Sequence, residues 1–408
     1  MLLPSKKDLD MWEDLRDYKI IEGDCISKMR ELQPESIDAI ITDPPYGIGF
    51  MNKKWDCSVP GLDWARECLR VLKPGGHIIA FSSTRTVHRL GVAIEDAGFE
   101  IRDTIHWCYF SGFPKNHDAS KAIDREAGAV RDVVGYQKLG GNAAMTLKEK
   151  GGTYASNTNS KGIKPIDVPI TKPTTQDAQK WEGYGTALKP AVEPAILARK
   201  PLEKGLTIAQ NVLKYGTGAL NIDDCRFGYG DPCWVGPQEG LCGWNDTQGF
   251  KNTHGDFGTQ NQEPRNHTKG RWPANLFQCA KPSRSEKDAG LDHLKRRTGK
   301  SNMCLNDGQG ERFDGKDSPD VANFHPTVKP IKLMRWVCRL IGGQKGSTIL
   351  DTFCGSGTTG AAAILEGYDF IGIEITSEYL PIIQGRLEWS KKQYMRENAQ
   401  ISLFEDVI

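Results

Sequence analysis

Residues 40–50, IITDPPYGIGF, join an apolar run to one carboxylate, two prolines and an aromatic ring. The apolar run is typical of a buried strand, and Pro44 and Pro45 cannot continue a sheet ladder because proline lacks a backbone donor. The pattern therefore predicts a stiff loop that presents Asp43 and Tyr46 at the carboxyl end of a strand. On this motif alone, an ordinary proline-rich turn stays open as the alternative.

A glycine-rich turn, DTFCGSGTTG at 351–360, ends a second predicted strand and opens a helix. Glycines let the backbone approach a ligand closely, and a helix amino terminus favours negative charge. The turn lacks the lysine of a GxxxxGKS/T loop and does not match GxGxxG, which disfavours an ATP or NAD site. Glu374 ends the next apolar run, where an acid about 20 residues beyond such a turn can bind ribose hydroxyls. A surface glutamate is the alternative.

Alternating strand-like and helix-like segments would position these loops. The first part of the chain has strand-like runs at 18–24, 37–43, 77–83 and 100–110, and helical spacing at 25–32, 62–72 and 86–97. The last part repeats the rhythm, with strands at 347–353 and 369–375 and helices at 332–341, after the glycine turn, and at 377–392. KPGG (73–76) is predicted to be a turn. This alternation predicts an α/β fold, with a mostly parallel sheet, helices on both faces, and contributions from both ends of the chain.

The middle of the chain differs in composition. Residues 139–180 and 226–270 are rich in Gly, Asn, Thr and Lys and show little periodicity, which indicates exposed loops or segments ordered by a partner. Residues 101–350 carry 36 Lys and Arg against 26 Asp and Glu, whereas both flanking parts are acidic. A basic middle between acidic ends indicates a polyanionic partner, with an unevenly charged surface as the alternative.

Composition excludes several classes of protein. The 408 residues are 38% hydrophobic, as in globular proteins, and contain no apolar run of about 18 residues that would predict a membrane span. The start of the chain lacks the apolar core of a signal peptide. The eleven cysteines are scattered without a CxxC pair, which suits reduced thiols in a cytoplasm. Cys225, Cys233 and Cys242 do not have zinc-site spacing, so we expect no metal.

Four motifs occur in the order DPPY (43–46), HPTVKP (325–330), DTFCGSGTT (351–359) and IGIE (371–374). Together they resemble the S-adenosylmethionine-dependent DNA amino-methyltransferases, which have a Rossmann-like sheet. With DPPY first and the FxGxG motif last, the order resembles the permuted beta group of that family. The middle, including GRWPANLF, is similar to that of members carried by phages and mobile elements.

The resemblance implies four parts of the chain. These are a catalytic half at 1–115, an inserted basic target-recognition region at 116–320, a cofactor-binding half at 321–392 and a tail at 393–408. It also implies that eight positions hold S-adenosylmethionine: Asp24 at the adenine, Glu374 at the ribose, Asp351 at the amino group, Phe353, Gly355 and Gly357 at the methionine part, and Thr327 and Lys329 closing the pocket. Thr352 stands where many relatives have proline, which puts nothing central in doubt.

The Asp-Pro-Pro-Tyr loop suits the methylation of an amino base. An exocyclic amine is a poor nucleophile because its lone pair is delocalised into the ring, and two acceptors on its N–H bonds would favour a tetrahedral nitrogen. The Asp43 carboxylate and the Pro44 carbonyl can be these acceptors, in a loop that the prolines hold in shape beforehand. Tyr46 can stack on the extruded base, worth roughly 1–3 kcal/mol against a flipping cost of a few kcal/mol.

Further expectations concern the substrate. Relatives with Asp in this loop mostly methylate adenine, so adenine in double-stranded DNA is favoured over cytosine. RNA or protein methylation and a non-catalytic DNA-binding protein are the alternatives. Trp181, Tyr184, Trp234 and Trp244 are expected to be core anchors rather than base-stacking groups. The candidates for phosphate contacts are Lys115, Lys121, Arg125, Lys164, Arg199, Lys200, Arg271, Lys295, Arg296 and Arg297.

The tail suggests a protein partner. Gln400-Ile401-Ser402-Leu403-Phe404 resembles the peptide by which bacterial replication proteins bind the sliding clamp. A tail that folds its apolar residues back onto the domain is the alternative. Because homodimers are common among beta-group relatives, we also expect a homodimer.

Overall fold

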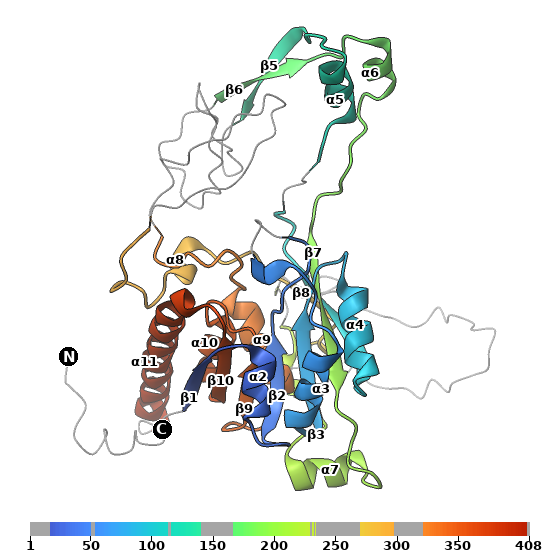
Figure 1. Cartoon of the computed structure of the whole chain (residues 1–408). Coiled ribbons are helices and arrows are strands. Elements are labelled where there is room, and N and C mark those ends of the chain that lie inside the picture. Colours follow the sequence, from blue (N-terminus) through green and yellow to red (C-terminus); the bar gives the residue numbers. More distant parts are fainter. Residues whose placement is uncertain are drawn as a thin grey trace, which may run out of the picture.

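The computed structural model describes residues 17–49, 54–112, 116–139, 166–228, 231, 233, 270–297 and 321–405. Within these residues, eight strands form a central sheet in the order β1-β10-β9-β2-β3-β7-β4-β8 (Figure 1). The strands are β1 (Tyr18–Glu22), β2 (Ile37–Thr42), β3 (Leu72–Phe81), β4 (Glu100–Cys108), β7 (Val192–Arg199), β8 (Leu276–Gln278), β9 (Thr348–Asp351) and β10 (Asp369–Glu374). All neighbours pair in parallel except β7, which is antiparallel to β3 and β4. The predicted mostly parallel α/β sheet is confirmed.

The two ends of the chain share this sheet. The carboxyl-terminal strands β9 and β10 lie between the amino-terminal strands β1 and β2. The middle of the chain adds β7 and β8 near the opposite edge, so the range 116–320 includes two strands of the central sheet. The division of the chain into four parts stays a prediction.

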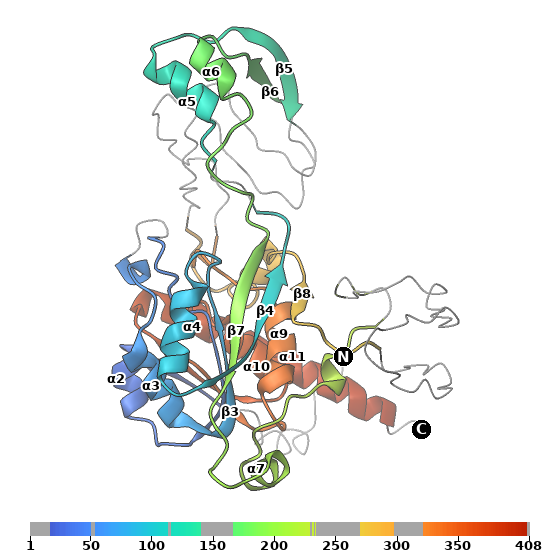
Figure 2. The same ribbon diagram turned by 90° about the vertical axis from the view of Figure 1, so that its right-hand side faces the viewer.

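Helices cover both faces of the sheet (Figures 1 and 2). On one face lie α2 (Cys25–Arg30), α3 (Leu62–Val71) and α4 (Val87–Asp96), and the other carries α9 (Ile331–Ile341), α10 (Thr358–Leu365) and α11 (Leu380–Glu405). Strands between two helical layers are buried on both sides, which is why β2 reads as the continuous run IDAIIT with every residue buried. The remaining elements beside the sheet are η2 (Lys54–Asp56), α7 (Ile208–Tyr215), η3 (Asp223–Cys225), α8 (Arg284–Lys287) and η4 (Ser377–Tyr379).

KPGG is not the turn that its sequence predicts, because β3 runs through it. The register with β2 shifts here, from Ile37 opposite Leu72 to Ala39 opposite His77, so the extra residues are accommodated inside the strand. Gly75 allows this with a left-handed φ of +79°. The buried Asn211 at α7 fixes the segment, since its Nδ2 donates to the Pro74 carbonyl at 2.9 Å.

A small lobe stands away from the sheet (Figures 1 and 2). It contains α5 (Ala119–Glu126), α6 (Gln176–Lys180) and the antiparallel pair β5 (Val133–Leu139) and β6 (Ile166–Thr171). Trp181 and Tyr184 lie on it in edge-to-face contact, with ring centroids 5.0 Å apart, and are 49% and 59% exposed. The prediction that these two aromatics anchor a core is therefore wrong, because both side chains lie on the surface of the lobe. Trp234 and Trp244 lie outside the described residues.

The last helix is longer than predicted. Ser377 does not cap it; a 3₁₀ turn, η4, comes first, and α11 then continues from Leu380 to Glu405. The backbone of residues 400–404 is therefore helical rather than an extended tail.

The described residues give no sign of a membrane span or a metal centre. None of their helices is both long and apolar enough to cross a membrane. They also contain no group of three or more His, Cys, Asp or Glu side chains placed to hold a metal ion. Cys225 and Cys233 are buried in the hydrophobic core, and Cys242 lies outside the described residues.

Candidate active site

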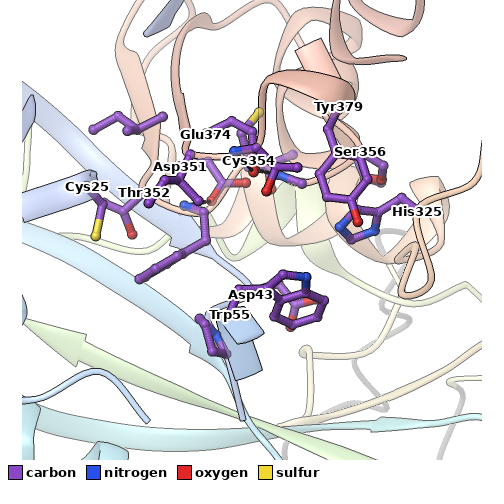
Figure 3. Close-up of a pocket in the computed structure, with 18 of the residues that line it drawn as sticks. Cys25, Asp43, Trp55, His325, Asp351, Thr352, Cys354, Ser356, Glu374 and Tyr379 are labelled. Carbon is purple, nitrogen blue, oxygen red and sulfur yellow. Dashed lines mark hydrogen bonds between the residues drawn. The ribbon is translucent and has the colours of Figure 1, made fainter. Parts of the chain in front are cut away.

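A cleft opens where the carboxyl ends of β2, β9 and β10 meet, as expected for adjacent parallel strands. Its empty volume is about 820 Å³, including space open to solvent. Figure 3 shows Asp43 and Trp55 on one side and Asp351, Cys354 and Glu374 across from them. Most of the predicted site residues line this cleft, namely Asp24, Asp43, Pro45, Thr327, Lys329, Asp351, Phe353, Gly355 and Glu374. The other three, Pro44, Tyr46 and Gly357, are neighbours of lining residues in the same two loops.

Asp43 follows β2 and has a donor at each carboxylate oxygen. The Tyr46 hydroxyl donates to its Oδ1 at 2.8 Å, and the Lys329 ammonium donates to its Oδ2 at 2.5 Å. Lys329 lies just before α9, so HPTVKP and DPPY meet although they are 286 residues apart in the sequence. The sequence indicated both motifs but not this ion pair.

Burial is the largest single influence on the pKa of each group in this cluster. It raises the pKa of Asp43, against the opposing effect of Lys329. It lowers the pKa of Lys329, but the carboxylates of Asp43 and Glu193 outweigh it and the net shift is upward. Burial and the same two carboxylates hold the pKa of Tyr46 well above its usual range. Lys329 is therefore held as an ammonium, and Tyr46 as a neutral hydroxyl.

The glycine turn packs closely on its surroundings. Gly355 has a φ of +56°, and a Cβ at this position would lie 2.9 Å from His325 Nε2. The backbone N–H of Gly355 donates to Glu374 Oε2 at 2.7 Å, while Thr376 N–H donates to Oε1 at 2.8 Å. Glu374 thus ties the end of β10 to the turn, and burial raises its pKa.

Asp351 ends β9 at the floor of the cleft. Its Oδ1 accepts from the Thr42 hydroxyl at 2.7 Å and from the Phe353 N–H at 3.1 Å. Burial raises the pKa of Asp351 to about 6, although hydrogen bonds from Thr359, Thr42 and Phe353 lower it. A cation placed beside this carboxylate would lower its pKa and favour the ionised form.

A buried arginine stabilises the glycine turn through hydrogen bonds. Arg386 Nη1 donates to the Ser356 carbonyl at 2.9 Å, to the Ser356 hydroxyl at 3.1 Å and to the Thr358 hydroxyl at 2.8 Å. Its side chain is 2% exposed, and burial lowers its pKa to about 10. Gly357, which caps α10 with a φ of +72°, lies between these two partners in the sequence.

Asp24 caps a helix as well as lining the cleft. Its Oδ1 accepts from the backbone N–H and the hydroxyl of Ser27, both at 2.9 Å, and so caps α2.

Several side chains in and beside the cleft were not predicted as site residues. Trp55, His325 and Tyr379 form an aromatic wall: the Trp55 and His325 rings are nearly parallel with centroids 6.5 Å apart, and His325 meets Tyr379 edge-on at 4.7 Å. His325 belongs to the HPTVKP motif, which could have indicated it, whereas the other two follow no pattern. Glu193, beside Lys329, was missed as well.

The structure separates the candidate phosphate contacts. Arg199 and Lys200 lie at the end of β7, the edge of the sheet opposite the cleft, so this prediction is wrong for both. Arg199 pairs with Glu100 at 2.6 Å, and Lys200 donates to the Leu72 carbonyl at 2.7 Å. Both side chains therefore stabilise the fold. They lie at this edge because β7 is antiparallel to its neighbours, so that its last residues are next to the first residues of the parallel strands.

The other candidates lie on the lobe, in the segments that contain Arg271 and Lys295–Arg297, or outside the described residues. Lys121 and Arg125 are on α5. Arg296 and Arg297 already have acidic partners at 3.7 Å and 3.2 Å. Lys115 and Lys164 lie outside the described residues.

The donor set suits S-adenosylmethionine, which carries a sulfonium, an ammonium and ribose hydroxyls. Four carboxylates line the cleft, those of Asp24, Asp43, Asp351 and Glu374, against one ammonium from Lys329. An acidic lining favours a cationic ligand and disfavours a phosphorylated nucleotide. Glycine at 355 lets the turn pack closely against the His325 ring, which also lines the cleft.

Comparisons with known proteins identify the family. The sequence model of the N6/N4 DNA methylase family matches residues 37–385. The type II methyltransferase M.HindIII of Haemophilus influenzae is 23% identical over 410 residues, covering 90% of this chain and 94% of that protein. M.HpaI of Haemophilus parainfluenzae is 33% identical over 166 residues, covering 37% of this chain and 50% of that protein.

Solved structures of similar proteins overlap most of the chain. The crystal structure of an M1.HpyAVI–SAM complex covers 91% of this chain and 98% of its own, with 18% identity and a TM-score of 0.41. PvuII DNA methyltransferase, described as cytosine-N4-specific, covers 94% of each chain, with 13% identity and a TM-score of 0.44.

Because the family match spans most of the sequence, the chain belongs to the DNA methylase family. It is an S-adenosylmethionine-dependent, site-specific DNA amino-methyltransferase with the motif order of the beta group.

Proposed function

We propose that this protein methylates the exocyclic N6 amino group of adenine at specific sites in double-stranded DNA, after the base is flipped out of the duplex. The observation that carries the proposal is the position of Asp43. It stands on a proline-held loop and faces the glycine turn across one cleft. An amino group held by this carboxylate would lie beside a ligand held by the turn.

The residues of the loop divide the work of holding the base. The Asp43 carboxylate and the Pro44 carbonyl accept the two amino N–H bonds and so direct the nitrogen lone pair toward the cofactor. Tyr46 provides a ring face for the flipped base. When bound, S-adenosylmethionine supplies the methyl group on its sulfonium. The prolines keep both acceptors in place before the base arrives.

The cofactor site would use the remaining predicted residues. Asp351 faces the cofactor ammonium, Glu374 the ribose hydroxyls and Asp24 the adenine. The turn residues Phe353, Gly355 and Gly357 line the methionine part, while Thr327 and Lys329 close the pocket beside the catalytic loop. Trp55, with His325 and Tyr379, adds an aromatic wall that excludes water from the reacting atoms.

The choice of adenine is supported by the acid at position 43. The chain belongs to the DNA methylase family, and the resemblance of its motifs to those of the amino-methyltransferases implies that Asp in this loop is typical of adenine enzymes. Cytosine N4 is the competing target, because its amino group has the same two N–H bonds.

Identification of the methylated nucleoside tests the proposal. Unmethylated duplex DNA would be incubated with the protein and isotope-labelled S-adenosylmethionine, digested, and analysed by mass spectrometry. We expect labelled N6-methyldeoxyadenosine, with at least about a hundredfold slower labelling by Asp43→Ala. Labelled N4-methylcytosine would refute the choice of base, and cofactor binding without label in any nucleoside would refute catalysis.

We also propose that the region 116–320, and above all the lobe, reads the target sequence. The lobe stands over the side of the sheet where the cleft opens, and it carries the exposed pair Trp181 and Tyr184 (Figure 1). Exposed aromatic rings can stack on bases or wedge between them.

Two proposals concern protein partners. Residues 400–404 bind the bacterial sliding clamp, which requires the end of α11 to unwind; a Leu403→Ala, Phe404→Ala variant that co-elutes with the clamp as wild type does would refute this. The protein is a homodimer, and a monomeric mass by light scattering at assay concentration would refute that.

A further inference from the structure

Glu193 is a largely buried acid at the edge of the catalytic cluster. It is the second residue of β7, and because this strand is antiparallel, its first residues reach the edge where the parallel strands end. Glu193 Oε2 lies 3.3 Å from Lys329 Nζ and 3.2 Å from the Tyr46 hydroxyl. The side chain is 19% exposed, as is that of Asp43.

The Lys329 ammonium is thereby held between two carboxylates. Its side chain is 6% exposed, and Nζ also lies 5.4 Å from the Tyr46 ring centroid and 5.1 Å from that of Phe81. These contacts leave the ammonium little room except between Asp43 and Glu193. With all three groups ionised, the cluster has one more negative charge than positive.

Methylation of an amine places positive charge at this point. The nitrogen lone pair forms the bond to the methyl carbon while the methyl–sulfur bond breaks, and its electron pair goes to sulfur. The nitrogen is then cationic until it releases a proton to water. A neutral Asp43–Lys329 pair would offer little stabilisation, whereas a second carboxylate leaves the cluster negative.

We propose that Glu193 is a positioning residue, which draws the Lys329 ammonium away from Asp43 when the target amino group enters and so frees the Asp43 carboxylate to accept its N–H. This inference rests on the proposed function. Only a rotation of the lysine side chain is needed, because Glu193 Oε2 is already 3.3 Å from Nζ. Tyr46 follows the lysine, since its hydroxyl reaches either carboxylate.

The variant Glu193→Gln tests the proposal because it keeps the shape and removes the charge. We expect the single-turnover methylation rate constant to fall about tenfold to a hundredfold, while the dissociation constants for S-adenosylmethionine and DNA stay within about twofold. Glu193→Asp should recover part of the rate. Glu100→Gln is the matched control, since Glu100 pairs with Arg199 at the opposite edge of the sheet.

The pH dependence separates this role from a structural one. Glu193 is one of the groups that raise the pKa of Asp43, so the acid limb of the rate profile should move to lower pH in Glu193→Gln. A structural role would lower the rate without moving the limb. The charged and titratable groups around the cluster, which stay unchanged in the variant, are Lys329, Tyr46, Asp351, Lys281 and Tyr109.

Two results would overturn the proposal in an active enzyme: a Glu193→Gln rate within about twofold of wild type, or a lower rate with an unmoved acid limb. If the wild type methylated no DNA, the proposed function would fail, and a separate measurement would decide on Glu193. In that measurement, NMR of isotope-labelled lysines follows the titration of Lys329. A lower midpoint in Glu193→Gln than in wild type would support the contact, and an equal midpoint would refute it.

Discussion

Gly355→Ala tests how the glycine turn forms the cofactor site. The backbone of Gly355 is left-handed, with a φ of +56°, and the added Cβ would lie 2.9 Å from His325 Nε2 and 3.1 Å from Cε1. The substitution therefore has two effects. It strains the backbone, and it pushes the His325 ring, which is part of the aromatic wall of the cleft.

The backbone strain changes the stability of the protein, whereas the displaced ring changes cofactor binding. A left-handed backbone costs a non-glycine residue about 1–2 kcal/mol, which lowers the free energy of unfolding. Contacts under 3.0 Å to a ring require a shift of that ring, and His325 lines the pocket. A loss of about 1.4 kcal/mol in binding is tenfold in Kd, so we expect the Kd for S-adenosylmethionine to rise about tenfold or more.

Calorimetric titration of the cofactor and denaturant unfolding would measure these effects separately. Gly128→Ala is the matched control. Gly128 has a similar φ of +66° on the lobe, and a Cβ there would have no neighbour within 4 Å. The control should show a similar decrease in the free energy of unfolding and an unchanged Kd for S-adenosylmethionine. An unchanged Kd in a folded Gly355→Ala protein would refute the argument that the added Cβ displaces His325. A raised Kd in Gly128→Ala would show that the effect on cofactor binding does not depend on that contact.

Further predictions concern support, charge and recognition. Arg386→Met should lower the unfolding free energy by about 2–4 kcal/mol, because it leaves three buried acceptors at the turn without their donor; a loss below about 1 kcal/mol would contradict this. Since the pKa of Asp351 is about 6, above that of an unfolded Asp, the ionised form is disfavoured by folding. The cofactor-free protein should lose on the order of 3 kcal/mol of stability as pH rises from about 4 to about 6, and Asp351→Asn should show a smaller loss in unfolding at several pH values. Asn211→Ala should cost about 2–3 kcal/mol of stability and leave the methylation rate constant unchanged, because Asn211 fixes KPGG far from the cleft. Trp181→Ala should weaken duplex binding in an anisotropy titration by about 1–3 kcal/mol with near-wild-type stability; equal DNA affinity would argue against the lobe as a reader.

Local patterns predicted which loops share the cleft where chemistry and strand ends coincide; the roles of the residues in them stay predictions. DPPY, the glycine turn and Glu374 each follow an apolar run, and parallel strands bring such ends together. The sequence also predicted the sharing of the sheet by the two ends of the chain. It did not predict the ion pair of Lys329 with Asp43, because no local pattern specifies a contact across 286 residues.

Strand direction explains the main errors. Ligands bind where parallel strands end, so acids that follow strands were predicted as site residues. Glu193 was missed because it stands at the start of β7, and this strand is antiparallel, which brings its first residues to the same edge. The same reversal takes Arg199 to the opposite edge, where it pairs with Glu100. KPGG failed as a turn because the register shift in β3 accommodates it.

The measurement that bears most directly on the account is single-turnover methyl transfer by Asp43→Ala, with cofactor affinity measured on the same preparation. The account predicts a rate constant at least about a hundredfold below wild type, with an unchanged Kd for S-adenosylmethionine, because Asp43 holds the amino group while the glycine turn holds the cofactor. Transfer at the wild-type rate would contradict the central claim that this carboxylate holds the target amine.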